Sequence, residues 1–181
     1  MRKLLQGKKV KITALKEGDE KLLEQWFDDP EFMRTYEVEA TIPRGERGVK
    51  DTLNYYNSSN EKLILAIRLA EGDKLIGICG FDNIIWTNAT AYLFIGIGDK
   101  EFRNKGFGKE ALNLLLDYAF NEMNFYKLQL NVIEYNRPAI KLYEKVGFIR
   151  EGLYREYIYR DGTRYHMFLY GIFKTEWKRN D

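Results

Sequence analysis

The feature that most constrains the fold is a glycine-rich turn between an apolar segment and an amphipathic one. Residues 95–109 read IGIGDKEFRNKGFGK, which predicts a strand, a loop with the pattern Arg-x-x-Gly-x-Gly from Arg103, and the start of a helix. Glycine lets the main chain approach a ligand, and a helix N-terminus carries a partial positive charge. The turn therefore suits a pyrophosphate, with Lys105 and Lys109 adding positive charge beside Arg103.

Besides a pyrophosphate site for another ligand, the pattern of this turn is compatible with a purely structural corner or with an ATP-binding turn. A structural corner before a helix uses the same glycines. The dinucleotide-binding pattern Gly-x-Gly-x-x-Gly is absent, and so is the P-loop pattern Gly-x-x-x-x-Gly-Lys-Ser/Thr. A protein that binds ATP through the glycine turn is the second alternative.

Composition excludes several kinds of site. Cys79 and His166 are the only cysteine and histidine, so we expect no disulfide, no zinc site and no Cys/His catalytic pair. The 29 basic and 27 acidic residues nearly cancel, which argues against nucleic-acid binding driven by charge. No apolar run reaches the roughly 20 residues of a membrane span, and the N-terminus lacks the apolar region of a signal peptide. We therefore expect a cytoplasmic protein without a membrane partner.

The order of predicted elements indicates the fold class. A strand over 10–15 precedes a helix capped by Asp19, a short helix with Phe32 and Met33, a loop over 36–48 and a third helix. The remaining pattern predicts strands at 63–69, 75–81, 91–98 and 127–133, helices at 108–121 and 137–146, and a final hairpin around 161–162. This order is typical of an α/β (α+β) domain with a mixed, mostly antiparallel sheet of about seven strands flanked by helices.

A second motif follows the strand predicted at 127–133. Asn136 precedes Pro138 in the position of a helix N-cap, and Gly147 stands where the helix is expected to end. Tyr143 lies two helical turns after Asn136, so the two side chains share a face. Capping and core packing explain each residue taken singly.

The two motifs together resemble the GCN5-related N-acetyltransferase superfamily over residues 10–173. Its cofactor motif, Arg/Gln-x-x-Gly-x-Gly/Ala, matches the turn that begins at Arg103. Its second motif, an Asn, an Ala and a Tyr before Gly-Phe, matches Asn136, Ala139, Tyr143, Gly147 and Phe148. The text around 116–128 is most similar to the branch with ribosomal-protein and spermidine N-acetyltransferases. The resemblance implies the acyl-CoA N-acyltransferase fold in a single N-acetyltransferase domain over 1–181, with its core at 10–173.

The resemblance also implies which residues hold acetyl-CoA. Main-chain groups of the strand predicted at 91–98 would meet the pantetheine arm, and a bulge at its late glycines would separate it from 127–133. The turn would hold the pyrophosphate, and Asn136 would bind the cofactor arm. The implied cofactor-binding residues are Gly96, Ile97, Gly98, Arg103, Asn104, Lys105, Gly106, Phe107, Gly108, Lys109 and Asn136.

The resemblance also implies a role for Tyr143, which would donate a proton to the departing thiolate. The leaving thiol has a pKa near about 8.5 by analogy with cysteine, whereas tyrosine has a pKa near about 10 and is protonated at neutral pH. Tyr143 is thus the expected catalytic general acid, and an N–H near Ile97 is the expected donor to the thioester oxygen. The general base stays open among a water chain and the carboxylates Glu134, Glu37 and Glu39.

The acceptor is less constrained than the reaction. The family branch often has a glutamate where this chain has the run Ala91-Tyr92-Leu93-Phe94, which weakens a polyamine or base role there. Glu37 and Glu39 are candidate substrate-binding residues for a cationic amine, or simply part of an exposed loop. We expect direct transfer to a small-molecule amine, polyamine, amino sugar or peptide N-terminus, without a metal, by a protein that forms a homodimer. The alternative is a non-catalytic acyl-CoA-binding sensor on the same fold.

Overall fold

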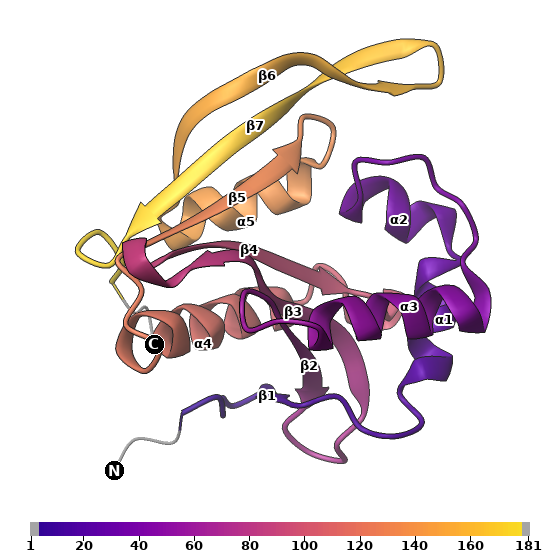
Figure 1. Cartoon of the computed structure of the whole chain (residues 1–181), viewed down its shortest axis with the longest axis horizontal. Coiled ribbons are helices and arrows are strands. Elements are labelled where there is room, and N and C mark those ends of the chain that lie inside the picture. The colour runs from indigo at the N-terminus through magenta and orange to yellow at the C-terminus, as the bar shows by residue number, and fades with distance from the viewer. Residues whose placement is uncertain (1–3, 179–181) are drawn as a thin grey trace.

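The fold is a single seven-stranded sheet, described for residues 4–178 by a computed structural model (Figure 1). The strand order is β1-β2-β3-β4-β5-β7-β6, and the β4–β5 pair is parallel while the other neighbours are antiparallel. The strands are β1 (Val10–Thr13), β2 (Leu63–Leu69), β3 (Leu75–Ile85), β4 (Thr90–Ile97), β5 (Lys127–Ile133), β6 (Ile149–Arg160) and β7 (Thr163–Phe173). The mixed, mostly antiparallel sheet is confirmed.

Within residues 4–178, five α-helices cover the two faces of this sheet. They are α1 (Glu20–Phe27), α2 (Pro30–Tyr36), α3 (Gly45–Asn57), α4 (Phe107–Asn121) and α5 (Arg137–Val146). The first three pack through Leu23, Phe32 and Val49 onto one face, where Ile78 of β3 is buried. Helices α4 and α5 pack on the other face with the larger core, which includes Cys79. Cys79 is fully buried, and burial raises the pKa of its thiol.

The parallel pair at the centre of the sheet is short. β4 pairs with β5 only from Thr90–Tyr92 to Lys127–Gln129, after which the two strands separate. The predicted separation is confirmed, but the predicted bulge at the late glycines is wrong. The register of β4 against β3 runs without interruption from Ile97 to Tyr92, and the irregularity lies between Asp82 and Ile85 at the far end of β3.

Asp19 occupies the predicted N-cap position of α1, but the prediction that its side chain caps the helix is wrong. Its side chain makes no cap hydrogen bond to α1. Instead Oδ2 accepts hydrogen bonds from the Lys16 N–H at 2.7 Å and from the buried guanidinium of Arg68 in β2. Arg68 also donates to Thr13 Oγ1 at 3.1 Å and to the carbonyl of Asp73 at 3.2 Å. The carboxylate therefore serves a buried ion pair that links the start of α1 to the sheet.

The ends of some elements differ from the prediction. Helix α3 begins at Gly45, inside the segment expected to be a loop, and β3 continues four residues past Phe81 to Ile85.

Within residues 4–178, no helix has both the length and the apolar character that crossing a membrane requires.

The ion pair yields a stability prediction. Asp19→Ala leaves the Arg68 charge buried without its carboxylate, so we expect the free energy of unfolding to fall by about 3–5 kcal/mol in urea titration. Asp73→Ala is the matched control, because Asp73 pairs with Lys11 and Lys16 at the surface and should contribute far less. Equal losses for the two variants would contradict the structural role of Asp19.

Candidate active site

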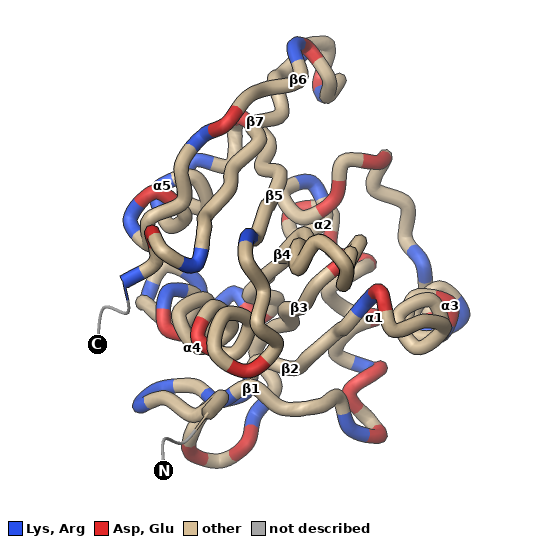
Figure 2. Tube along the Cα trace, turned by 60° about the vertical axis from the view of Figure 1, so that its left-hand side comes forward, with Lys and Arg blue, Asp and Glu red and all other residues tan. Residues whose placement is uncertain are grey.

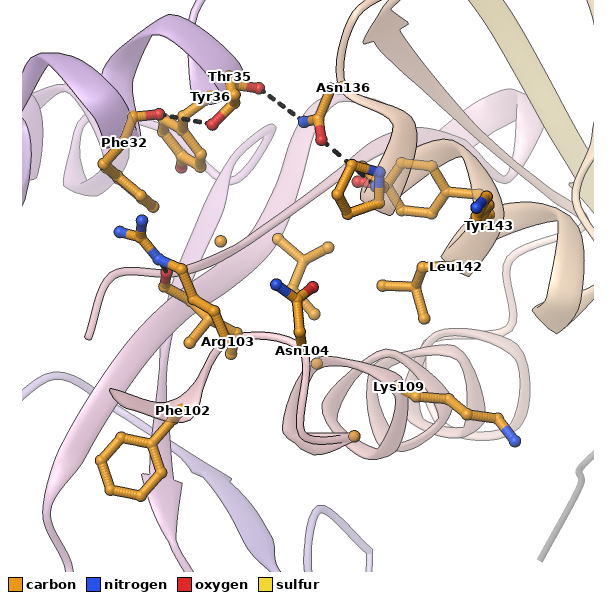
Figure 3. A pocket seen from close by; sticks show the side chains of 18 of the residues that line it. Phe32, Thr35, Tyr36, Phe102, Arg103, Asn104, Lys109, Asn136, Leu142 and Tyr143 are labelled. Carbon is orange, nitrogen blue, oxygen red and sulfur yellow. Dashed lines mark hydrogen bonds between the residues drawn. The ribbon is translucent and has the colours of Figure 1, made fainter. Parts of the chain in front are cut away.

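A cleft of about 530 Å³ opens where β4 and β5 separate (Figure 3). Its walls come from α2, the end of β4, the glycine turn, the first turn of α4 and the face of α5 that carries Tyr143. The cleft is therefore bounded by elements from both faces of the sheet. Because β5 no longer pairs with β4 here, main-chain groups on that side of β4 lack a strand partner.

The glycine turn has the backbone that its sequence requires. Gly106 is the N-cap of α4 and has φ 88°, a left-handed conformation that favours glycine, and Asn104 has φ 58°. Gly108 lies where a Cβ atom would contact Ile97 and Leu142 at 3.6 and 3.9 Å. The turn thus brings the start of α4 close to both β4 and α5.

Arg103 connects the turn to the strand rather than extending freely from it. Its Nε donates to the carbonyl of Ile97 at 2.9 Å, and its Nη2 donates to the carbonyl of Gly98 at 2.8 Å. Its Nη1 lies 3.5 Å from a carboxylate oxygen of Glu31, and its guanidinium stands over the ring of Phe32. Arg103 therefore holds the end of β4 against the turn and α2.

One cation near the turn was not found from the sequence. Lys9, just before β1, donates from Nζ to the carbonyl of Lys105 at 3.3 Å and lies over the ring of Phe107. A Cβ on Gly106 would be 3.5 Å from this ammonium. No local pattern links two segments this far apart in the chain, so only the fold reveals that Lys9 adds positive charge to the turn.

Nine of the twelve predicted catalytic and cofactor-binding residues line this one cleft: Gly96, Ile97, Arg103, Asn104, Gly106, Gly108, Lys109, Asn136 and Tyr143. Gly98, Lys105 and Phe107 do not line it. Gly98 instead packs beneath Trp26 of α1, so closely that a Cβ atom would overlap the indole ring. A packing constraint therefore accounts for glycine at that position.

Asn136 has the predicted N-cap role and a second bond that the sequence did not reveal. Its Oδ1 accepts from the N–H of Ala139 at 3.3 Å, which caps α5. Its Nδ2 donates to the carbonyl of Thr35 at 3.1 Å, so it links α5 to α2 across the cleft (Figure 3). Phe32, Thr35 and Tyr36 of α2 are lining residues that carry no recognisable sequence signal.

Tyr143 lies on the cleft side of α5, as its spacing from Asn136 predicts. Its side chain is buried, its ring contacts Phe148 edge-on at a centroid distance of 5.8 Å, and it extends toward Asn136 in Figure 3. Burial raises the pKa of the phenol to about 12. The hydroxyl is therefore neutral at physiological pH and is able to donate a proton.

The three candidate carboxylate bases have different surroundings. Glu134 Oε2 accepts from the N–H of His166 at 2.9 Å, so that carboxylate is engaged by β7. Glu37 lies 3.6 Å from Arg44, and burial raises the pKa of its carboxyl group. Neither Glu37 nor Glu39 lines the cleft that contains Tyr143; both line a neighbouring cavity.

Three of the residues that line the cleft are lysines. Lys141 and Lys145 of α5 line it together with Lys109 of α4. Their spacing of four residues on one helix was a signal that the sequence offered. Three lysines around a cleft suit an anionic ligand.

No group of three or more His, Cys, Asp or Glu side chains able to hold a metal ion occurs within residues 4–178.

Comparison with known proteins identifies the family. Residues 9–149 match the family model described as the acetyltransferase (GNAT) domain, and the chain belongs to this family. Among curated relatives, an uncharacterised N-acetyltransferase p20 from Bacillus licheniformis is 27% identical over 96% of this chain and 97% of its own length. A spermidine N(1)-acetyltransferase from Vibrio cholerae is 27% identical over 78% of this chain and 79% of its own length.

Solved structures agree with the fold. The crystal structure of spermidine N-acetyltransferase from Vibrio cholerae in complex with CoA and spermine has a TM-score of 0.84 over 93% of this chain and 97% of that chain, at 24% identity. The family model and the curated relatives identify the protein as an acetyl-CoA-dependent N-acetyltransferase.

The packing of Gly98 gives a prediction for the site's framework. Gly98→Ala places a methyl group against Trp26, so we expect a loss of about 1–3 kcal/mol in the free energy of unfolding. Trp26→Leu removes the ring. In that background, Gly98→Ala should lower the free energy of unfolding by less than half as much, which a double-mutant cycle measured by urea unfolding tests. Additive losses would contradict the contact.

Proposed function

We propose that the protein transfers an acetyl group from acetyl-CoA directly to a primary amine, with Tyr143 as the general acid. The observation that carries this proposal is the buried, neutral phenol of Tyr143 in the cleft left open between β4 and β5. As the amine attacks the thioester carbonyl, charge develops first on the carbonyl oxygen and then on the departing sulfur. As the C–S bond breaks, a phenol at the sulfur protonates the departing thiolate, and the proton that the amine nitrogen loses returns to the phenolate through solvent.

The cofactor would run through the cleft from the glycine turn to Tyr143. Backbone N–H groups from Asn104 to Lys109 would hold the pyrophosphate, since they precede or begin α4. The unpaired edge of β4 past Tyr92 would hold the pantetheine arm, with an N–H near Ile97 directed at the thioester oxygen. Arg103 then acts on the cofactor through the strand that it holds, because its guanidinium is already bonded to two strand carbonyls.

Asn136 would exchange its bond to Thr35 for one to the cofactor arm. Its cap to Ala139 uses Oδ1, whereas the bond across the cleft uses Nδ2. A ligand carbonyl is able to replace the Thr35 carbonyl without disturbing the helix cap. This exchange supports a role for Asn136 in binding as well as in starting α5.

The acceptor is proposed to be a small-molecule amine, with a peptide N-terminus as the alternative. Relatives named spermidine N(1)-acetyltransferase support the small-molecule class. A direct route is favoured because Cys79 is fully buried on the α4 face of the sheet and does not line the cleft. The cytoplasmic location, the homodimer and the absence of metal and nucleic-acid partners stay predictions.

The experiment is thermal melting with acetyl-CoA, followed by thiol release across an amine panel. We expect acetyl-CoA to raise the melting midpoint and ATP to leave it unchanged. Thiol release with one class among spermidine, amino sugars and short peptides then identifies the acceptor. A melting shift without release from any amine would favour an acyl-CoA-binding sensor, and no shift at all would contradict the cofactor site.

Replacing the phenol tests its role in catalysis. Tyr143→Phe removes the proton donor but keeps the ring, so we expect kcat to fall by about 10²- to 10⁴-fold while the acetyl-CoA melting shift persists. Tyr118→Phe is the matched control, because Tyr118 lies on α4 outside the cleft, and its kcat should be unchanged. Unchanged turnover in Tyr143→Phe would remove the phenol from the mechanism.

The raised pKa of Tyr143 also sets a pH dependence. A neutral phenol donates protons, and this form is lost only as the pH rises through about 12. The activity should therefore rise with pH as the acceptor amine, whose pKa is about 10.4, loses its proton. Steady-state kcat between pH 6 and 10 should show no descending limb, and a fall in kcat within that range would contradict Tyr143 as the acid.

A further inference from the structure

A second cavity of about 600 Å³ lies on the α1–α3 face of the sheet, beside the cofactor cleft. Tyr36 lines both spaces, so the two adjoin at this residue. Its ring stacks on Phe32 at a centroid distance of 5.0 Å and meets Phe94 of β4 edge-on at 6.4 Å. A Cβ on Gly96 would lie 3.0 Å from it, so the cavity borders the part of β4 where the thioester would lie.

The cavity is acidic. Its lining includes four carboxylates, Glu37, Glu39, Asp51 and Asp82, against a single guanidinium, that of Arg44. Arg44 is already engaged, because it lies 3.6 Å from Glu37 and donates to Thr52 at 3.3 Å. Figure 2 shows two of the acidic positions in the loop that leads from α2 to α3. The excess negative charge favours a cationic occupant.

Asp82 is the one of these four carboxylates that lies on the sheet, in β3. Its Oδ2 accepts a hydrogen bond from the hydroxyl of Tyr56 in α3 at 2.9 Å. Its Oδ1 is buried and receives no hydrogen bond from residues 4–178. Burial raises the pKa of this carboxyl group even though the Tyr56 hydroxyl and the nearby charge of Lys62 favour its ionised form, so its charge is compensated incompletely. A cation that enters the cavity would supply the missing compensation.

The register between β3 and β4 gives the distance from Asp82 to the part of β4 where the thioester would lie. Asp82 pairs with Tyr92, Gly80 with Phe94, and Ile78 with Gly96, so these residues share one face. Asp82 and Gly96 are thus separated by four residues along the strands, which at roughly 3.3 Å per residue is about 13 Å. A cation at Asp82 is therefore too far from the thioester to be the reacting nitrogen.

We propose that this cavity is the acceptor pocket, and that Asp82 selects linear amines carrying a second cationic group on the order of 10 Å from the reacting nitrogen. The chain between the two nitrogens passes Tyr36, which lines the cavity and whose ring suits methylene groups. The hydroxyl of Tyr56 fixes the carboxylate that faces the distal cation. This inference rests on the proposed function. It adds the class of acceptor, a linear amine with a second cationic group, and the residue that recognises it, Asp82.

The test uses linear diamines from 1,3-diaminopropane to 1,10-diaminodecane at saturating acetyl-CoA. We expect kcat/KM to increase with length, and 1,8-diaminooctane to exceed both 1-aminooctane and 8-aminooctan-1-ol at least about tenfold, the size of a charge-assisted contact. The two neutral-ended amines match the diamine in length. This comparison needs only the unaltered protein, so it does not depend on any variant folding.

The variant Asp82→Asn assigns the preference to one side chain. We expect it to lower kcat/KM for 1,8-diaminooctane about tenfold, to the level of 1-aminooctane, with the acetyl-CoA melting shift retained. Glu46→Gln is the matched control, because Glu46 is an exposed carboxylate of α3 that pairs with Lys50 outside the cavity.

The outcomes separate this inference from the proposed function. Equal kcat/KM for the diamine and its neutral-ended analogues, or an Asp82→Asn variant that keeps the diamine preference, would overturn the acceptor pocket while leaving the N-acetyltransferase activity in place. Thiol release only with peptides or amino sugars would overturn it in the same way. Failure of the proposed function shows instead as full turnover in Tyr143→Phe, whatever amine is used.

Discussion

The structure of the site depends on the early end of the parallel ladder between β4 and β5. A parallel pair that continued to Ile97 would satisfy the main chain of β4 on both sides and close the sheet. Because the pairing stops at Tyr92 and Gln129, β4 presents main-chain groups that have no partner on β5 to a cleft lined from both faces of the sheet. The cleft therefore arises from backbone geometry, and side chains add charge, a proton donor and selectivity to it.

Contacts from distant segments hold that opening in shape. Arg103 bonds the carbonyls of Ile97 and Gly98, and Trp26 packs on Gly98 from the other side. Asn136 spans the cleft to Thr35, so α2 and α5 are linked above the strand ends. These contacts fix the distance between the glycine turn and the phenol on α5, which a cofactor of defined length must span.

The parts of the site that could be predicted from sequence are those built from local pattern. The turn from Arg103 and the pair Asn136 and Tyr143 each occupy a short stretch whose spacing reports the backbone directly. Asp19 was misassigned because Arg68, its partner 49 residues away, outcompetes the helix N-terminus for the carboxylate. Lys9 at the turn and the pair of Tyr56 with Asp82 were missed for the same reason, since folding alone brings such residues together.

The central claim is that acetyl-CoA occupies the opening between β4 and β5. Backbone amide chemical shifts, recorded by NMR during a titration with acetyl-CoA, test it most directly because they report on each main-chain N–H separately. The account predicts the largest shifts at residues 93–98 of β4 and 104–109 of the turn, with β1 and the β6–β7 hairpin tip little changed. Saturable binding with shifts confined to other segments would contradict it.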